Sequence, residues 1–222
     1  MGSHVELAAA DGHRLSAYVA SPPGRPRGGI VVIQEIFGVT RHIREVTDQY
    51  AAAGFQSIAP AMFDRLEPNV DVPYNDVARG KDYVTRLKDE QITLDVQAAI
   101  DCVRGAGKVG IVGYCWGGAV AYLAAVRNDV DAAVAYYGAA IGRHVADGTA
   151  KPRVPILFHF GDKDASIPLP VVEQIKTAVP EGIFHLYPAG HGFNCTERQS
   201  FEPVSAKLAL ERSLEFLHRT LG

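Results

Sequence analysis

The sequence lacks strong net charge, long hydrophobic runs and a signal-peptide pattern, each of which marks a large class of proteins. Lysine and arginine number 22 against 25 aspartates and glutamates, so the formal net charge is −3. Such a balance supplies none of the basic surface that nucleic acids require. No apolar run approaches the roughly 20 residues that cross a bilayer, and the first residues show no charged start followed by an apolar core. We therefore expect neither nucleic-acid nor membrane partners.

Cysteine is also scarce, and the motifs that bind common cofactors are missing. The three cysteines, at positions 102, 115 and 195, form an odd set without the spacing of a disulfide framework. This usage predicts a reducing, cytoplasmic environment. No C-x-x-C, H-E-x-x-H or carboxylate-rich loop indicates a metal, and no G-x-G-x-x-G segment indicates a dinucleotide. We therefore expect no cofactor. The opening residues 1–4 are assigned no role.

Strand and helix patterns alternate through the chain. The β-branched run at residues 29–36 is typical of a strand buried on both faces. Further strands are predicted at residues 16–20, 55–59, 108–113, 132–136, 156–160 and 183–187. Helices are predicted at residues 40–53, 76–104, 119–126, 171–178 and 205–219. The longest of these is expected to bury Val84, Leu87, Leu94, Ala98 and Val103.

This alternation predicts the fold class. Strands separated by helices indicate an α/β fold, a three-layer sandwich whose mostly parallel central sheet carries helices on both faces. No linker or repeat divides the chain, so we expect a single domain over residues 1–222.

One short segment combines glycine with cysteine at the end of a predicted strand. Residues 110–118 read Gly-Ile-Val-Gly-Tyr-Cys-Trp-Gly-Gly, followed by an alanine-rich helix. The segment resembles the nucleophile elbow of α/β-hydrolases, with the thiol of Cys115 where serine normally stands. Gly113 and Gly117 lack a Cβ and so let strand and helix approach closely at a strained turn. The amides that open the helix would favour a thiolate. The alternative is a small buried cysteine in a strand-to-helix turn.

An acid and a histidine follow later strands. Asp164 comes after the strand at 156–160, and His191 lies between two glycines after the strand at 183–187. Sites in such sheets form where the strands end, so these side chains are expected to meet Cys115. Histidine activates a thiol, and a carboxylate on its far side orients the ring. Asp162 competes for the acid role, but it suits a turn better.

Two backbone amides and one carboxylate complete the candidate site. The N–H groups of Trp116 and Ile36 are predicted to stabilise an oxyanion, because they follow the nucleophile and the first strong strand. Glu35 ends that strand. From the residues alone it is either a helix-capping acid or part of the site, where it would oppose or accept the charge of a nearby thiol.

Four segments together resemble the dienelactone hydrolase (carboxymethylenebutenolidase) family. They are Gln34-Glu35-Ile36-Phe37-Gly38, Gly113-Tyr114-Cys115-Trp116-Gly117-Gly118, Gly161-x-x-Asp164 and Gly190-His191-Gly192-Phe193. The resemblance runs nearly end to end. It implies a cysteine hydrolase that opens a lactone ring through a thioester, without a cofactor. It also implies that Glu35 holds the resting cysteine as a thiol and takes its proton when substrate arrives.

The resemblance further implies that the substrate carries a carboxylate, which calls for arginine donors. Arg79 and Tyr83, four residues apart, resemble one family element of that clamp, although a solvated helix arginine is the plain alternative. A second family arginine is missing, because Cys195 stands at its position. Arg198 is the candidate replacement, and Phe37 is a further substrate-binding candidate.

Two other functions stay open. One is a broader small-ester carboxylesterase or thioesterase on the same Cys115, Asp164 and His191 set. The other is a non-catalytic binding or redox-sensing protein. In each case we expect a small-molecule ligand and a monomer, with a dimer as the alternative.

Overall fold

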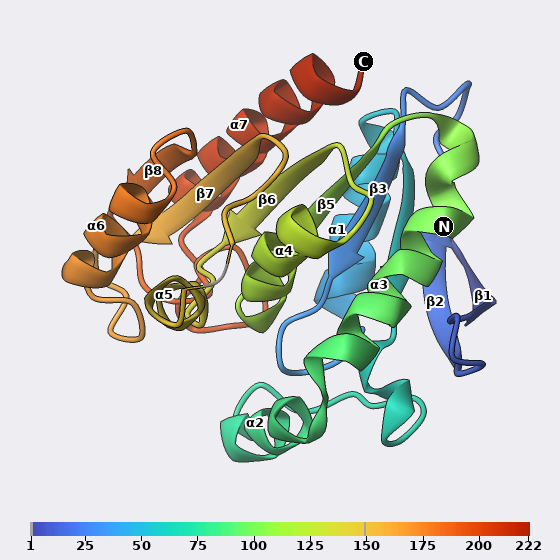
Figure 1. Cartoon of the computed structure of the whole chain (residues 1–222), viewed down its shortest axis with the longest axis horizontal. Helices are drawn as coiled ribbons and strands as arrows, with labels where there is room; N and C mark the ends of the chain where they lie inside the picture. Colours follow the sequence, from blue (N-terminus) through green and yellow to red (C-terminus); the bar gives the residue numbers. More distant parts are fainter. Residues whose placement is uncertain (1, 149) are drawn as a thin grey trace.

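Eight strands form one mixed sheet in the computed structural model, which describes residues 2–148 and 150–222 (Figure 1). The strands are β1 (Ser3–Ala8), β2 (Arg14–Ala20), β3 (Gly29–Ile33), β4 (Gln56–Pro60), β5 (Val109–Tyr114), β6 (Ala132–Tyr136), β7 (Ile156–Gly161) and β8 (Ile183–Tyr187). Their order in the sheet is β1-β2-β4-β3-β5-β6-β7-β8. The β1–β2 and β2–β4 pairs are antiparallel, and all the others are parallel. The predicted mostly parallel sheet is therefore confirmed.

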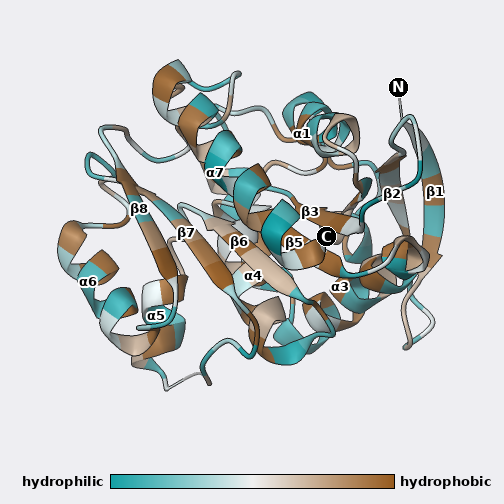
Figure 2. Cartoon of the chain, turned by 90° about the horizontal axis from the view of Figure 1, so that it is seen from above, coloured by the Kyte–Doolittle hydropathy of each residue, from teal (hydrophilic) through white to brown (hydrophobic). Residues whose placement is uncertain are grey.

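Helices cover both faces of this sheet. They are α1 (Arg41–Ala52), α2 (Val77–Arg86), α3 (Asp89–Val103), α4 (Trp116–Arg127), α5 (Ile141–Ala146), α6 (Leu169–Ala178) and α7 (Pro203–Leu221), with short 3-10 turns η1 (Met62–Arg65) and η2 (Arg104–Ala106). Figure 2 shows α1 and α7 on one face and α3, α4 and α6 on the other. The predicted three-layer α/β sandwich is confirmed. None of the helices in the described part of the chain has the length and apolarity needed to cross a membrane.

The apolar core divides into a large and a small cluster. The large cluster fills both faces of the sheet, where every residue of β3 and β5 is buried, as the β-branched run at residues 29–36 predicts for β3. The small cluster lies beyond the carboxyl end of β3 and consists of Ile36, Phe37, Phe63, Val72 and Tyr83. It is called the α2 cluster here, because Tyr83 attaches α2 to the rest of the protein through it.

The helix expected over residues 76–104 is wrong, because the chain forms two helices there. Leu87 has an extended backbone, with φ −80° and ψ 142°, which ends α2. Lys88 is also extended and α3 begins at Asp89. Leu87 packs against both apolar clusters, so the break turns α2 away from the sheet. The buried face of α3 consequently differs from the expected one and consists of Ile92, Asp95, Val96, Ala99, Ile100 and Val103.

One strand and one α-helix have no counterpart in the predictions. The first is β1, an edge strand in which only Leu7 is buried, so it lacks an apolar face to mark it. It contains Ser3 and His4, to which no role was assigned. The second is α5, which spans only six residues. In addition, the strand expected over residues 29–36 ends at Ile33, so the segment after it is a loop at the carboxyl edge.

Candidate active site

Cys115 occupies a strained turn between β5 and α4. Its backbone has φ 55° and ψ −116°, and its N–H donates to the carbonyl of Tyr136 at 3.0 Å. A non-glycine residue at positive φ is uncommon and is held there by its surroundings. A Cβ at Gly113 would lie 1.8 Å from the carbonyl oxygen of Gly117, and one at Gly117 would lie 2.5 Å from that of Ile33. Both positions therefore require glycine, as the sequence predicted.

The structure brings Cys115, His191 and Asp164 together from three separate loops. His191 Nε2 lies 3.0 Å from Cys115 Sγ, and His191 Nδ1 lies 2.8 Å from Asp164 Oδ2. The side chain of Asp164 is fully buried, and its Oδ1 accepts a hydrogen bond from the Ser166 N–H at 2.8 Å. Asp162, the competing acid, is exposed. Asp164 is thus held by one oxygen while the other faces the imidazole.

The surroundings of His191 favour its charged form. Burial lowers the pKa of this histidine, but the hydrogen bonds to Asp164 and Cys115 outweigh it and raise the pKa to about 10. An imidazolium hydrogen-bonded to a sulfur favours the thiolate over the thiol. The two hydrogen bonds of His191 therefore join Cys115 and Asp164 into one continuous chain.

Glu35 and Arg198 form a second buried pair beside the first three residues. Glu35 is 1% exposed, and its Oε1 accepts a hydrogen bond from Arg198 Nη1 at 3.0 Å. Burial raises the pKa of Glu35, and the charges of Arg198 and His191 act in the opposite direction. The Arg198 guanidinium also lies 5.7 Å from the centre of the Phe37 ring. The structure therefore brings Arg198, Glu35 and Phe37 into contact.

Cys195 stands where the resemblance implies an arginine. Its side chain is fully buried, and burial together with the nearby charge of Glu35 raises its pKa to about 12. It is therefore a neutral thiol at physiological pH. Arg198 lies three residues further along the same loop, and its guanidinium pairs with Glu35.

Arg79 and Tyr83 lie on α2, at a different part of the site. Tyr83 is buried and donates its hydroxyl hydrogen to Glu67, while Arg79 Nη2 donates to the Tyr83 hydroxyl at 3.4 Å. Arg79 itself is exposed, with its guanidinium 5.8 Å from the Tyr83 ring. The contacts of the described residues join Arg79 to Tyr83 but not to Cys115 or Glu35.

The two predicted oxyanion donors lie in the loop after β3 and at the first residue of α4. Within residues 2–148 and 150–222, no hydrogen bond uses the N–H of Ile36 or of Trp116. A Cβ at Gly117 would also lie 2.5 Å from the carbonyl oxygen of Gln34, so the loop and the start of α4 are in close contact. The proximity of these two segments is what the predicted pair of donors requires.

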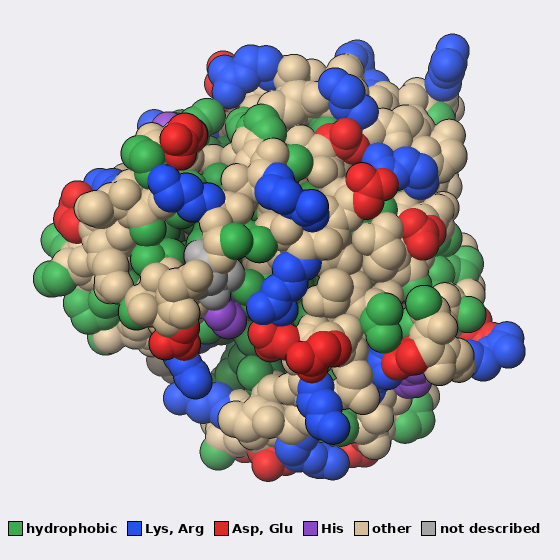
Figure 3. Space-filling view, viewed as in Figure 1, with side chains coloured by type: hydrophobic (Ala, Val, Ile, Leu, Met, Phe, Trp, Pro, Cys, Tyr) green, Lys and Arg blue, Asp and Glu red, His purple; other side chains and the backbone are tan. Residues whose placement is uncertain are grey.

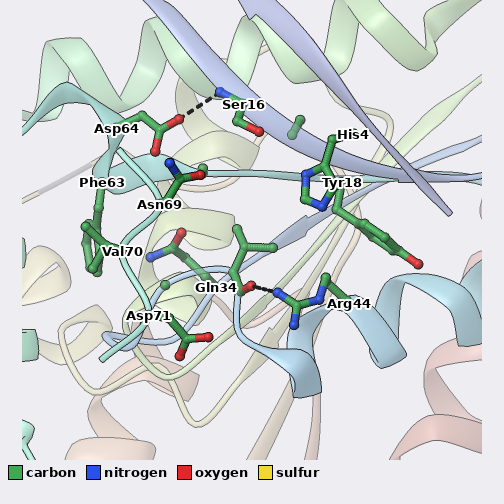
Figure 4. Close-up of a pocket in the computed structure, with 14 residues that line it drawn as sticks. His4, Ser16, Tyr18, Gln34, Arg44, Phe63, Asp64, Asn69, Val70 and Asp71 are labelled. Atoms are coloured by element: carbon green, nitrogen blue, oxygen red, sulfur yellow. Dashed lines mark hydrogen bonds between the residues drawn. The ribbon is translucent and has the colours of Figure 1, made fainter. Parts of the chain in front are cut away.

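Two hollows adjoin these residues. A groove of about 430 Å³ lies between the α2–α3 junction and the helices α4 and α5, lined by apolar side chains that include Leu87, Trp116 and Ala140. Figure 3 shows this hollow beside α2, with hydrophobic side chains inside and charged ones around the rim. A separate cavity of about 270 Å³ lies near Gln34 and Arg44 (Figure 4), and the lining of neither hollow includes Cys115, Asp164 or His191. The described residues contain no group of three or more histidine, cysteine or acidic side chains able to hold a metal.

The mixed sheet, the cysteine on a sharp turn between β5 and α4, and the acid and histidine after β7 and β8 define an α/β-hydrolase fold. A family model described as the dienelactone hydrolase family matches residues 15–221. The chain belongs to the dienelactone hydrolase family, a family of hydrolases. Both the predicted fold class and the predicted family are confirmed.

Individual relatives cover nearly the whole chain. Carboxymethylenebutenolidase from Pseudomonas putida is 35% identical over 224 residues, which cover 96% of this chain and 94% of the relative. Carboxymethylenebutenolidase 1 from Cupriavidus pinatubonensis is 31% identical over 227 residues, covering 96% and 95%. A crystal structure from Klebsiella pneumoniae, described as a dienelactone hydrolase, superposes with a TM-score of 0.82 at 30% identity and covers 97% of this chain and 98% of its own.

Sequence reasoning missed two residues at this edge of the sheet, Phe63 and Tyr137. Phe63 stacks on Trp116 at 5.7 Å and on Tyr83 at 5.1 Å, and so connects α2 to the start of α4. Tyr137 packs edge-on against His191 at 5.2 Å. Neither lies in a recognisable motif, and only the position of Tyr137 directly after a predicted strand could have pointed to it.

Proposed function

We propose that this protein hydrolyses a small carboxylated lactone through a thioester on Cys115. The observation that carries the proposal is the hydrogen-bonded chain from Cys115 Sγ to His191 at 3.0 Å and from His191 to Asp164 at 2.8 Å. Membership of the dienelactone hydrolase family supports the substrate class. Two relatives that cover almost the whole chain carry the name carboxymethylenebutenolidase.

The reaction follows from the charges of these groups. The Cys115 thiolate attacks the lactone carbonyl, and the oxyanion that forms accepts hydrogen bonds from the amides of Ile36 and Trp116. The ring C–O bond breaks, and the leaving oxygen takes the proton of the His191 imidazolium. His191 then removes a proton from water, which attacks the thioester and releases the acid as the C–S bond breaks. Asp164 stabilises the imidazolium throughout.

Glu35 is proposed to control the proton of Cys115. In this structure its Oε1 bonds to Arg198, and Cys115 bonds to His191, which is the arrangement expected for an activated thiolate. The resting state implied by the family has Glu35 next to the thiol instead. Burial raises the pKa of Glu35, which suits a carboxylate that must accept and release a proton.

Two arginines are candidates to bind the substrate carboxylate. Arg198 uses one nitrogen for Glu35, and its guanidinium carries five N–H donors in all, so it can bind a second carboxylate. Phe37 packs under the same guanidinium. Arg79 with Tyr83 on α2 would contribute from the other side.

A broader small-ester hydrolase is the second candidate. It is favoured by the engagement of Arg198 with Glu35 and by the groove next to the nucleophile turn, whose lining includes the apolar side chains of Trp116 and Leu87. A neutral ester would need no arginine and would place its apolar part in that groove.

Steady-state hydrolysis of a carboxylated dienelactone and of a neutral short-chain aryl ester tests the proposal. Cys115→Ala should abolish turnover of both, and Cys115→Ser should be much slower than wild type. Cys102→Ala is the matched control, because Cys102 is an exposed cysteine on α3 and its loss should change nothing. Turnover of the lactone with a poor rate on the ester supports the lactonase, and the reverse supports the general esterase. Full activity in Cys115→Ala would refute both.

A further inference from the structure

Helix α2 packs directly against Ile36, one of the two proposed oxyanion donors. A Cβ at Gly80, inside α2, would overlap the Ile36 carbonyl oxygen and would lie 3.0 Å from Cγ1 and 3.2 Å from Cβ of the Ile36 side chain. Gly80 is buried, and its N–H donates to the Asp76 carbonyl at 3.2 Å within the helix. The backbone of α2 therefore forms the surface against which Ile36 lies.

Glycine at position 80 needs a reason, because it weakens a helix. A glycine inside a helix costs roughly 0.5–1 kcal/mol relative to alanine. Gly80 is not one of the glycines with a positive φ, so no left-handed backbone conformation requires it. The close approach of Ile36 does require it, because any side chain at position 80 would collide with the Ile36 carbonyl oxygen.

Both peptide groups that flank the Cα atom of Ile36 are held in place. Gln34 Nε2 donates to the Glu35 carbonyl at 3.3 Å. That carbonyl belongs to the same planar peptide group as the Ile36 N–H, so the bond also orients this N–H. The next peptide group carries the Ile36 carbonyl, which lies against Gly80. Contact with α2 therefore helps to fix the residue whose N–H is proposed to bind the oxyanion.

The same helix reaches the second proposed donor through stacked aromatic rings. Phe63 lies between Tyr83 of α2 and Trp116, with ring centroids 5.1 Å and 5.7 Å apart and planes at 18° and 28°. Trp116 is the first residue of α4, and its N–H is the other proposed donor. One helix thus supports both residues, directly at Ile36 and through Phe63 at Trp116.

We propose that α2 is a positioning element for the oxyanion site, and that Gly80 is the positioning residue through which the helix places Ile36. The inference rests on the proposed function, because an oxyanion forms only if Cys115 attacks a carbonyl group. Helix α2 then acts at the reacting carbonyl as well as at the substrate carboxylate, which Arg79 and Tyr83 are proposed to bind.

Gly80→Ala tests the contact between α2 and Ile36. The added methyl group must displace Ile36, and a misplacement of about 1 Å near a reacting centre costs about 10²-fold in rate. We therefore expect kcat to fall by about 10²-fold for both the carboxylated dienelactone and the neutral aryl ester, with KM little changed. Alanine also favours a helix more than glycine does, so a weakened α2 would not explain the loss.

Alkylation of Cys115 by iodoacetamide separates the oxyanion site from the rest of the active site. The thiolate displaces iodide from a CH₂ group, so no negative charge develops on a carbonyl oxygen. The alkylation rate is followed on the Cys115 peptide by mass spectrometry across pH, and it should be the same in Gly80→Ala and wild type. An equal loss of alkylation and hydrolysis would mean that the Cys115–His191 pair is disturbed, and would overturn the inference.

Two control variants separate the contact from general effects of glycine and alanine. Gly105→Ala is the matched control, because a Cβ at that position would meet nothing within 4 Å. Ala78→Gly lowers the helix propensity of α2 at an exposed residue. Both should keep the wild-type kcat. Hydrolysis by Gly80→Ala within threefold of wild type overturns the inference, as does an equal loss in Ala78→Gly.

A second variant decides the matter if Gly80→Ala shows no cooperative unfolding in urea. Phe63→Leu removes the stack on Trp116 but keeps an apolar side chain in the α2 cluster. It should lower kcat for both substrates with alkylation unchanged, and absence of that pattern overturns the inference. Failure of Cys115→Ala to abolish hydrolysis would instead overturn the proposed function.

Discussion

Replacing Asp164 with asparagine tests whether the carboxylate sets the tautomer of His191, because asparagine keeps the size of the side chain and removes its charge. The Asp164 side chain is fully buried, with Oδ1 bonded to the Ser166 N–H and Oδ2 to His191 Nδ1, each at 2.8 Å. Asparagine would keep its oxygen on Ser166 and present its NH₂ group to His191. That choice stabilises the tautomer with hydrogen on Nε2, which cannot take a proton from the water that hydrolyses the thioester.

The expected loss is large. A change of tautomer of this kind lowers kcat by about 10⁴-fold in a hydrolase with the same three roles. The pKa of His191 should also fall below about 10, because the bond to the Asp164 carboxylate is one of the contacts that raise it. We expect a small change in KM, since Asp164 lies behind the imidazole and does not face the substrate.

The assay is steady-state hydrolysis with urea unfolding measured in parallel. Asp162→Asn is the matched control, because it makes the same change two residues away on an exposed side chain. It should leave both rate and stability unchanged. An Asp164→Asn enzyme within tenfold of the wild-type kcat would refute the reasoning, and so would an equal loss in Asp162→Asn.

Two further predictions concern stability. Arg65 pairs with the buried Asp95 at 2.7 Å, and the Arg65 side chain is itself only 6% exposed. Arg65→Met should lower the free energy of unfolding by about 3 kcal/mol, because it leaves the Asp95 carboxylate buried without its partner. Arg14→Met, which breaks an exposed pair, should change it little in the same urea titration, and equal effects would contradict the argument. For His191, the pKa is raised from 6.5 to about 10 on folding, so its contribution to stability is complete below pH 6.5 and is lost as the pH rises towards 10. Between pH 6.5 and about 10, the free energy of unfolding of wild type should therefore fall by more than that of His191→Asn. Parallel curves of unfolding free energy against pH would refute this prediction.

The sheet could be predicted from the sequence because its central strands carry their own signal. The run that forms β3 is β-branched, both β3 and β5 are fully buried, and β6 and β8 occupy the predicted residues. The edge strand β1 has five exposed residues of six, so no periodicity marks it. The break at Leu87 has no proline or glycine to announce it, because it depends on packing against two clusters.

The candidate site also has parts that could be predicted from the sequence and parts that could not. The convergence of Cys115, Asp164 and His191 could be predicted because parallel strands end at one edge and each residue follows a strand. The pairing of Glu35 with Arg198 could not, since 163 residues separate the two and the arginine is three positions from the place where the family implies one.

The α2 cluster has a consequence for how this protein can change over evolutionary time. Its five residues form a small apolar body outside the main core, and Cys115 and Trp116 pack against it. Mutations in these five side chains would reshape the wall over the nucleophile while the large cluster continues to stabilise the sheet. New substrate preferences can therefore be acquired through size-conserving changes in this cluster, apart from the core that holds the sheet together.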